Sequence, residues 1–158
     1  MKRILLALLP ATAWAQDRPN VIWLMADDLG YGDLSCFGAT RIHTPNIDRV
    51  AKEGVRFTDM HACASTSTPS RYGILTGEYP FCHPRTDVAA GDASTIIWPQ
   101  QYTLADMMQS VGYRTGAFGK WHLGLGSRTG QQDWNGKIDV GPDSLGFDYS
   151  YIMAATSD

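Results

Sequence analysis

The chain has 158 residues, which is enough for one domain with a hydrophobic core. Its content of 44% hydrophobic and 18% charged residues is ordinary for a globular protein. The formal charge is −3 and no basic run or stripe occurs, which argues against nucleic acid as a partner.

A secretory signal peptide is predicted at residues 1–15. Lys2 and Arg3 precede an apolar run at residues 4–15, and residues 13–15, Ala-Trp-Ala, form a cleavage site of the A-x-A type. The run is too short to span a bilayer, and the alternative is a buried N-terminal helix. We therefore expect an exported protein, periplasmic or secreted, with no membrane span. Without Lys2 and Arg3 its formal charge is −5.

After the predicted signal peptide, the sequence predicts a strand, a helix and a second strand. Residues 20–25 form a continuous apolar run, which predicts a buried strand of the parallel-sheet kind. Thr44 caps a helix that runs to about Glu53, with Gly54 as its stop. Residues 55–61 alternate well enough to predict a second strand.

Five consecutive residues, Ser67 to Arg71, predict the start of another helix. Thr68 suits the N-cap, Pro69 suits the first helical position, and Gly77 suits the position that ends the helix. A helix N-terminus with a guanidinium one turn in suits a tetrahedral oxyanion. Taken alone, the stretch fits a capped helix in any α/β protein.

A polar loop rich in Pro and Gly is predicted over residues 78–101, and a third helix follows it. Thr103 caps this helix with Asp106 at the capping-box position, and Gly112 ends it. Its expected core stripe has the spacing i, i+3, i+4, i+7: Leu104, Met107, Met108 and Val111.

The last third of the chain predicts two more strands. Residues 113–119 form the first, residues 127–144 a polar loop, and residues 146–155 the start of the second. Strands and helices alternate, which predicts an α/β sheet covered by helices on both faces. No closing element follows, and so residues 16–158 are expected to be the N-terminal portion of a larger domain, incomplete at its C-terminus.

Polar side chains follow the predicted strands, where ligands bind in open α/β sheets. The adjacent carboxylates Asp27 and Asp28 suit Ca²⁺ or, less well, Mg²⁺, and a solvated turn is the alternative. Lys120 and His122 lie on the same side of an extended segment. Lysine can hold an anionic oxygen and histidine can transfer a proton, and simple surface residues are the alternative.

Other reactive side chains give weaker signals. The three cysteines match no zinc motif, and the sequence leaves open which pair, if any, forms a disulfide: Cys36, Cys63 and Cys82. Three histidines have no catalytic context: His43, His61 and His83. Residues 133–135, Asp-Trp-Asn, could contact a sugar or form a turn, and we favour the turn.

Four motifs occur in the order seen in type I sulfatases. They are residues 20–33, Asn-Val-Ile-Trp-Leu-Met-Ala-Asp-Asp-Leu-Gly-Tyr-Gly-Asp; residues 44–48, Thr-Pro-Asn-Ile-Asp; residues 67–71 with Leu-Thr-Gly at 75–77; and residues 119–124, Gly-Lys-Trp-His-Leu-Gly. The chain resembles the N-terminal part of that family over nearly all of residues 18–158. The resemblance implies the alkaline-phosphatase-like α/β fold.

The resemblance also implies a modified residue. In the family, the first position of the Cys/Ser-x-Pro-x-Arg signature, Ser67 here, is oxidised to Cα-formylglycine. One hydroxyl of the hydrated aldehyde attacks sulfur and displaces the sugar or aryl alcohol, and the other then loses its proton, which expels sulfate and regenerates the aldehyde. The serine form is matured by anaerobic radical enzymes of bacteria, and so we expect such a maturase as a partner and a bacterial source.

The remaining roles are implied residue by residue. Arg71 orients the formylglycine, Lys120 binds the nucleophile or the sulfate oxygens, and His122 assists the second step. The implied calcium ligands are Asp27, Asp28 and Ser67. The family's downstream Asp-Asn/Gln pair and later His and Lys are not in this chain, and so we expect these 158 residues alone to be inactive and to bind metal weakly.

The expected function is therefore that of a sulfuric ester hydrolase of the arylsulfatase type, acting on a sulfated carbohydrate or an aryl sulfate. A phosphatase or phosphonate hydrolase of the same superfamily is an alternative, which Pro69 and Arg71 disfavour. A non-catalytic binder of sulfated glycans is another, and the negative charge opposes it. The loops at residues 79–101 and 127–143 are candidates for shaping a sugar subsite.

Overall fold

The computed structural model describes residues 18–127 and 131–155. It divides into two compact units, one ending at Thr44 and one beginning at Pro45. The predicted signal peptide, residues 1–15, lies outside the described residues. Within the described ranges, no helix combines the length and the apolar character needed to cross a membrane.

Two of the predicted strands are wrong. Residues 20–25 and 55–61 belong to no strand in the described structure, and their apolar side chains are exposed, with Leu24 at 89% and Val55 at 80%. A buried parallel strand needs neighbouring strands for its backbone hydrogen bonds. The local pattern indicated an apolar segment correctly, but it says nothing about whether a partner strand lies beside it.

In the first unit, two short turns follow the Asp27–Asp28 pair. They are the 3₁₀ turns η1 (Tyr31–Asp33) and η2 (Ser35–Phe37). The Ser35 amide donates to the Thr44 hydroxyl at 3.0 Å, and the Thr44 amide donates to the Ser35 hydroxyl at 2.8 Å. These reciprocal bonds close the segment between the two residues into one loop.

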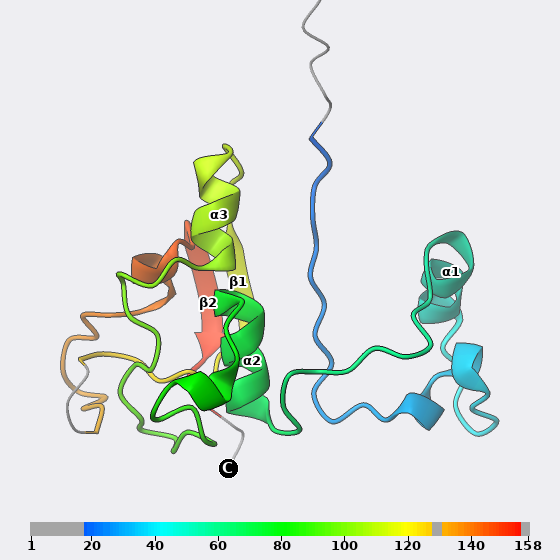
Figure 1. Cartoon of the computed structure of the whole chain (residues 1–158), viewed down its shortest axis with the longest axis horizontal. Coiled ribbons are helices and arrows are strands. Elements are labelled where there is room, and N and C mark those ends of the chain that lie inside the picture. The colour runs from blue at the N-terminus through cyan, green and yellow to red at the C-terminus, as the bar shows by residue number, and fades with distance from the viewer. Residues whose placement is uncertain (1–17, 128–130, 156–158) are drawn as a thin grey trace, which may run out of the picture. The chain divides into compact units, whose positions relative to one another are not determined.

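The predicted helices are present in the second unit (Figure 1). They are α1 (Pro45–Glu53), α2 (Ser67–Thr76) and α3 (Leu104–Ser110), and the 3₁₀ turns η3 (Pro80–Cys82) and η4 (Pro142–Leu145) lie in the loops. The glycine predicted to end α2, Gly77, has a left-handed φ of 70°, and its amide donates to the Gly73 carbonyl. Glycine adopts that conformation without strain, and so the predicted end of the helix at Gly77 is confirmed.

The predicted N-cap of α2 is wrong. The helix begins at Ser67, which makes Thr66 the N-cap and Pro69 the third helical residue. The Thr68 hydroxyl is engaged elsewhere, because it accepts from the Ala89 amide and donates to a backbone carbonyl more than fifty residues away. Tertiary contacts therefore set the helix start two residues earlier than the capping preference predicted.

The predicted capping box of α3 is confirmed, but its core stripe is only partly so. The Thr103 hydroxyl accepts from the Asp106 amide at 3.1 Å, and the Asp106 carboxylate accepts from the Thr103 amide at 2.9 Å. Met107 and Val111 are 44% and 47% exposed, and Ala105 is the buried residue instead. This seven-residue helix packs through its first turn, where Thr103 also bonds to η4.

The described sheet has two parallel strands, β1 (Gly116–Lys120) and β2 (Tyr149–Met153). Before the strands begin, the Thr115 amide donates to the Asp148 carboxylate at 2.7 Å. This bond is the main reason that the pKa of the Asp148 carboxyl lies below its ordinary value. The α/β class is confirmed, because helices pack beside a parallel sheet.

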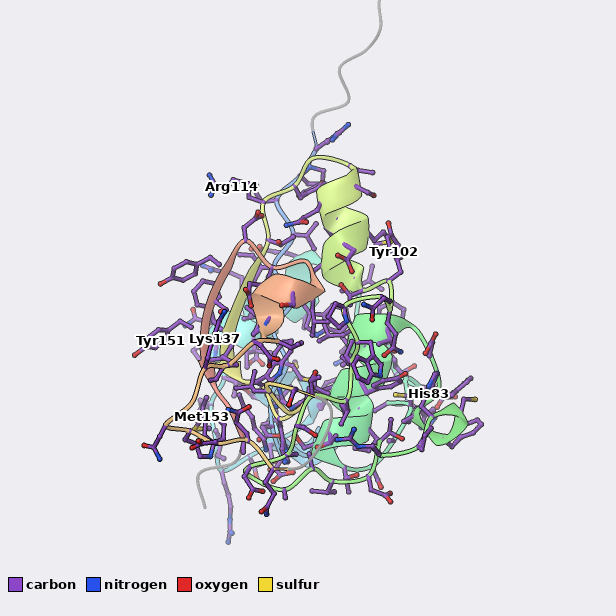
Figure 2. All side chains as sticks on the ribbon, turned by 90° about the vertical axis from the view of Figure 1, so that its left-hand side faces the viewer. His83, Tyr102, Arg114, Lys137, Tyr151 and Met153 are labelled. Atoms are coloured by element: carbon purple, nitrogen blue, oxygen red, sulfur yellow. The ribbon has the colours of Figure 1, made fainter. Side chains whose placement is uncertain are left out.

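A single hydrophobic core underlies the second unit. Its buried members come from α2, the loop before α3, the segment after β1, and η4: Tyr72, Ile97, Trp121, Leu123, Leu125 and Leu145. Ala117 and Ile152 of the sheet pack against this core. Tyr151 and Met153 project from the other face of β2, away from α2 and α3, and are 75% and 45% exposed (Figure 2). Helices over that second face stay a prediction.

Candidate active site

The first turn of α2 meets the segment that leaves β1. Lys120 ends the strand, and residues 121–126 after it are all buried. The carboxyl end of a parallel strand is the usual place for a ligand in α/β folds. Four residues predicted from sequence therefore come from two elements that lie together: Ser67, Arg71, Lys120 and His122.

Arg71 joins the two elements. Its Nε–H donates to Ser67 Oγ at 2.9 Å, and its Nη1–H donates to the Lys120 carbonyl oxygen at 2.6 Å. The first contact spans one helical turn, since residues four apart lie on the same helix face. A guanidinium presents several donors in a fixed fork, and this one holds Ser67 and the end of β1 at the same time.

His122 contacts the same oxygen. Its Nδ1 lies 3.0 Å from Ser67 Oγ, and its Nε2 lies 2.8 Å from the Ala89 carbonyl oxygen. A carbonyl only accepts, and so the hydrogen of a neutral His122 ring belongs on Nε2. Nδ1 then keeps its lone pair and can accept the hydroxyl hydrogen of Ser67.

Ser67 Oγ thus accepts a hydrogen bond from Arg71 and can donate one to His122. Arg71 can only donate to this oxygen, which leaves the Ser67 hydrogen free for His122 Nδ1. A cation and a nitrogen base therefore converge on one oxygen atom. This arrangement can stabilise negative charge on that oxygen and can remove its proton.

The backbone of His122 is held in an uncommon conformation. Its φ is 55°, in the left-handed region that residues other than glycine seldom adopt. The His122 amide donates to the Ala154 carbonyl at 3.0 Å, and the His122 carbonyl accepts from Thr68 at 3.0 Å. Such conformations persist where the surroundings fix them, and they cluster at functional sites. The side chain is only 2% exposed.

The structure says less about the roles of the other predicted site residues, Lys120, Asp27 and Asp28. Lys120 is partly buried, and its backbone oxygen accepts a hydrogen bond from Arg71. Asp27 and Asp28 belong to the first unit, where both are exposed in a bend and Asp28 has a φ of 58°. Within the described ranges, no group of three or more His, Cys, Asp or Glu residues could hold a metal ion.

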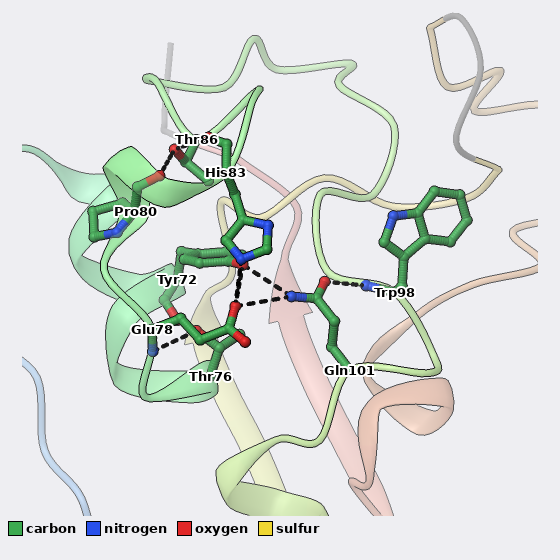
Figure 3. Close-up of polar contacts among 8 residues, drawn as sticks. All are labelled: Tyr72, Thr76, Glu78, Pro80, His83, Thr86, Trp98 and Gln101. Carbon is green, nitrogen blue, oxygen red and sulfur yellow. Dashed lines mark hydrogen bonds and ion pairs between the residues drawn. The ribbon is translucent and has the colours of Figure 1, made fainter.

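Sequence reasoning missed a second polar cluster, on the far end of α2 (Figure 3). The Tyr72 hydroxyl donates to Glu78 Oε2 and accepts from Gln101 Nε2, both at 2.9 Å. His83 Nε2 lies 2.7 Å from the same Glu78 oxygen. Burial is the main cause that raises the pKa of Tyr72 to about 12. His83 has no signal in the sequence because its partners lie in the surrounding loops.

Two of the weaker signals can be compared with the structure. All three cysteines are free thiols: Cys36, Cys63 and Cys82. Residues 133–136 form the favoured turn, in which Asp133 accepts hydrogen bonds from the Asn135 amide at 2.9 Å and the Gly136 amide at 3.0 Å.

The family model described as Sulfatase matches residues 19–158, nearly the whole chain. Among curated proteins, an N-acetylgalactosamine-6-O-sulfatase from Bacteroides thetaiotaomicron is 52% identical over 141 residues. That match covers 89% of this chain and 27% of the relative. The chain thus spans little more than a quarter of that protein's length.

Several solved structures are also similar to this chain. One from Bacteroides thetaiotaomicron, described in connection with the metabolism of multiple glycosaminoglycans, is 52% identical with a TM-score of 0.85, and the match covers 88% of this chain and 29% of that chain. Another, in complex with its substrate D-glucosamine-2-N,6-O-disulfate, is 33% identical with a TM-score of 0.61. It covers 84% of this chain and 22% of that chain.

Proposed function

Because the chain belongs to the sulfatase family, with its alkaline-phosphatase-like fold, we propose that the protein hydrolyses a sulfuric ester of a carbohydrate. The observation that carries this proposal is the convergence of Arg71 and His122 on Ser67 Oγ, at 2.9 Å and 3.0 Å. Ser67 is the first residue of the family signature.

Ser67 is the proposed site of the modification. As Cα-formylglycine, residue 67 would supply a hydrated aldehyde: one hydroxyl would attack sulfur and displace the sugar alcohol, and the other would then lose its proton, expelling sulfate and regenerating the aldehyde. Arg71 would hold the oxygen on residue 67 through Nε and offset its negative charge. His122 would accept a proton from that oxygen at Nδ1, because Nε2 is committed to the Ala89 carbonyl. Lys120 would bind the nucleophile or the sulfate oxygens as a point charge.

Calcium is the proposed metal. The donor chemistry of Asp27 and Asp28 fits it, since two carboxylates at an exposed bend offer the oxygen ligands that Ca²⁺ prefers. By the family resemblance, residue 67 would add a further ligand. Two carboxylates fall short of the usual six to eight oxygens, and the rest would come from elsewhere. Bound there, the ion would polarise sulfate oxygens.

The substrate proposal follows from the relatives. An N-acetylgalactosamine-6-O-sulfatase and a protein solved with a sulfated glucosamine both act on sulfated sugars. A sulfated carbohydrate is therefore favoured over a simple aryl sulfate. Export to the periplasm or beyond, and maturation by an anaerobic-type formylglycine-generating enzyme, belong to the same proposal.

The experiment is to produce the full-length protein together with an anaerobic maturase and to analyse the Ser67 peptide by mass spectrometry. We expect the loss of two hydrogens from Ser67, together with sulfate release from sulfated sugars. Ser67→Ala is expected to abolish that release, because alanine cannot be oxidised to the aldehyde. Intact serine with glycan binding but no turnover would favour the binder, and faster turnover of an aryl phosphate than of an aryl sulfate would favour the phosphatase.

A further inference from the structure

The Thr68 hydroxyl lies at the centre of a buried ring of hydrogen bonds. It accepts from the Ala89 amide at 3.0 Å and donates to the His122 carbonyl at 3.0 Å. The side chain is fully buried, with 0% of its surface exposed. One hydroxyl therefore satisfies two backbone groups from segments that are 21 and 54 residues away along the chain.

The third side of the ring closes on the imidazole. The Ala89 carbonyl oxygen lies 2.8 Å from His122 Nε2. Ala89 belongs to a loop without regular secondary structure, and so no helix or strand fixes its position. The hydrogen bond from its amide to the Thr68 hydroxyl holds this part of the loop against the first turn of α2.

The geometry has a consequence for the base at Ser67. The carbonyl of Ala89 fixes the hydrogen of the ring on Nε2, and it also fixes the orientation of the ring. Only then does the lone pair of Nδ1 point at Ser67 Oγ, 3.0 Å away. A base whose second nitrogen is held by a carbonyl depends on whatever holds that carbonyl.

We propose that Thr68 is a positioning residue, which clamps Ala89 to the backbone of His122 and so keeps the Ala89 carbonyl on Nε2 and the basic Nδ1 on residue 67. Its catalytic effect rests on the proposed sulfatase function, whereas the clamp itself does not. The sequence pattern assigns Thr68 only an N-cap role, and the Thr66 N-cap shows that it does not have that role.

A purely structural role for Thr68 is the competing explanation. Thr86 provides a matched control, because it is also a buried threonine, 7% exposed, in the same loop as Ala89. Its hydroxyl bonds to the His83 and Pro80 carbonyls and makes no bond to His122. Thr86→Val thus removes a buried hydroxyl from the loop without touching the clamp.

The experiment compares Thr68→Val, Thr68→Ser and Thr86→Val with the wild type. NMR at a pH where the imidazole is neutral reports which ring nitrogen of His122 carries hydrogen and whether that hydrogen is protected. Hydrogen exchange reports the Ala89 amide. Turnover is measured per formylglycine residue, counted by mass spectrometry, because Thr68 lies inside the signature that the maturase reads.

We expect Thr68→Val to lose the protected Nε2–H signal and to speed exchange of the Ala89 amide about tenfold, the loss of one hydrogen bond. Its kcat should fall about tenfold or more with KM little changed, as when an outer partner of a catalytic histidine is removed. Thr68→Ser should restore all three readouts, and Thr86→Val should leave them as in the wild type.

Two results would overturn the clamp. One is a wild-type ring hydrogen on Nδ1 instead of Nε2, which needs no variant to observe. The other is a Thr68→Val protein that retains the protected Nε2–H and the slow Ala89 amide. A protein that shows the clamp but releases no sulfate would instead overturn the proposed function, and so the two failures are distinguishable.

Discussion

At the scale of single residues, the side chain of Arg71 connects two elements of the fold. Its Nε and Nη1 atoms bond to Ser67 Oγ and to the Lys120 carbonyl, which belong to different elements. Lysine has one nitrogen on a flexible stem and cannot reproduce two bonds at fixed angles. Charge at this position is therefore not sufficient, because the fork also sets the distance between α2 and the end of β1.

We predict that Arg71→Lys lowers kcat/KM roughly a hundredfold or more, because one donor to the oxygen of residue 67, the proposed nucleophile, is lost or misplaced. Steady-state kinetics on a sulfated sugar, normalised to the formylglycine content, measures this. Arg49→Lys on the exposed surface of α1 is the control and should match the wild type. Activity of Arg71→Lys equal to that of Arg49→Lys would show that charge alone is enough.

At the scale of elements, the Tyr72 cluster connects the end of α2 to the loops on either side of η3. The Tyr72 hydroxyl donates to Glu78, and Glu78 also contacts His83 just after η3. Gln101 reaches the same hydroxyl from the loop before α3. The buried phenol is held neutral, since burial raises its pKa from 10.0 to about 12.

This shift predicts an alkaline loss of stability. In the unfolded chain Tyr72 loses its proton near its ordinary pKa, whereas in the folded chain it keeps the proton to about pH 12. The stabilisation is therefore fully present below about pH 10, and about 2–3 kcal/mol is lost as the pH rises through the folded pKa. Urea unfolding of the wild type and Tyr72→Phe across this range measures the difference.

We expect the advantage of the wild type over Tyr72→Phe to shrink by that amount between about pH 10 and pH 12. Tyr102→Phe is the matched control, because Tyr102 is 62% exposed and bonds only weakly, at 3.3 Å, to Ser110. A constant difference between the wild type and Tyr72→Phe over the whole range would contradict the prediction.

Helices were predictable here because their signals are local. The Thr103–Asp106 capping box and the left-handed Gly77 both lie within a few residues of the helix ends that they define. Strands depend on neighbours that may be distant in the chain: β1 pairs with β2, about thirty residues later. The apolar runs at residues 20–25 and 55–61 lack such neighbours in the described structure, and no local pattern could indicate that.

The candidate site likewise has one part that could be predicted from the sequence and another part that could not. Ser67, Arg71 and His122 could be named as candidates because each belongs to a short motif with a recognisable spacing. Ala89 contributes only backbone atoms, which leave no trace in a side-chain pattern, and Thr68 matched a capping preference that its tertiary contacts override. What sequence reasoning missed was the set of contacts that hold the predicted residues in place.

At the scale of the whole molecule, the core of the second unit includes chain neighbours of the site residues: Tyr72 follows Arg71, and Trp121 and Leu123 flank His122. Ile97 is fully buried, and the Ile96 amide before it donates to the Leu123 carbonyl at 3.0 Å, next to His122. Segments far apart in sequence therefore meet in one cluster, and a cavity in the cluster would loosen the segment that carries the imidazole. Stability and site geometry should consequently change together.

We predict that Ile97→Ala lowers the free energy of unfolding by about 2–5 kcal/mol, because it removes buried methylene groups and leaves a cavity. Ile138→Ala deletes the same atoms from a side chain that is 42% exposed, and should change the free energy by only about 0.5 kcal/mol. Chemical denaturation of both variants measures the contrast. Equal losses in the two variants would mean that Ile97 does not lie in the core described above. A loss confined to Ile97→Ala, accompanied by faster exchange of the His122 amide, would show that this core supports the site.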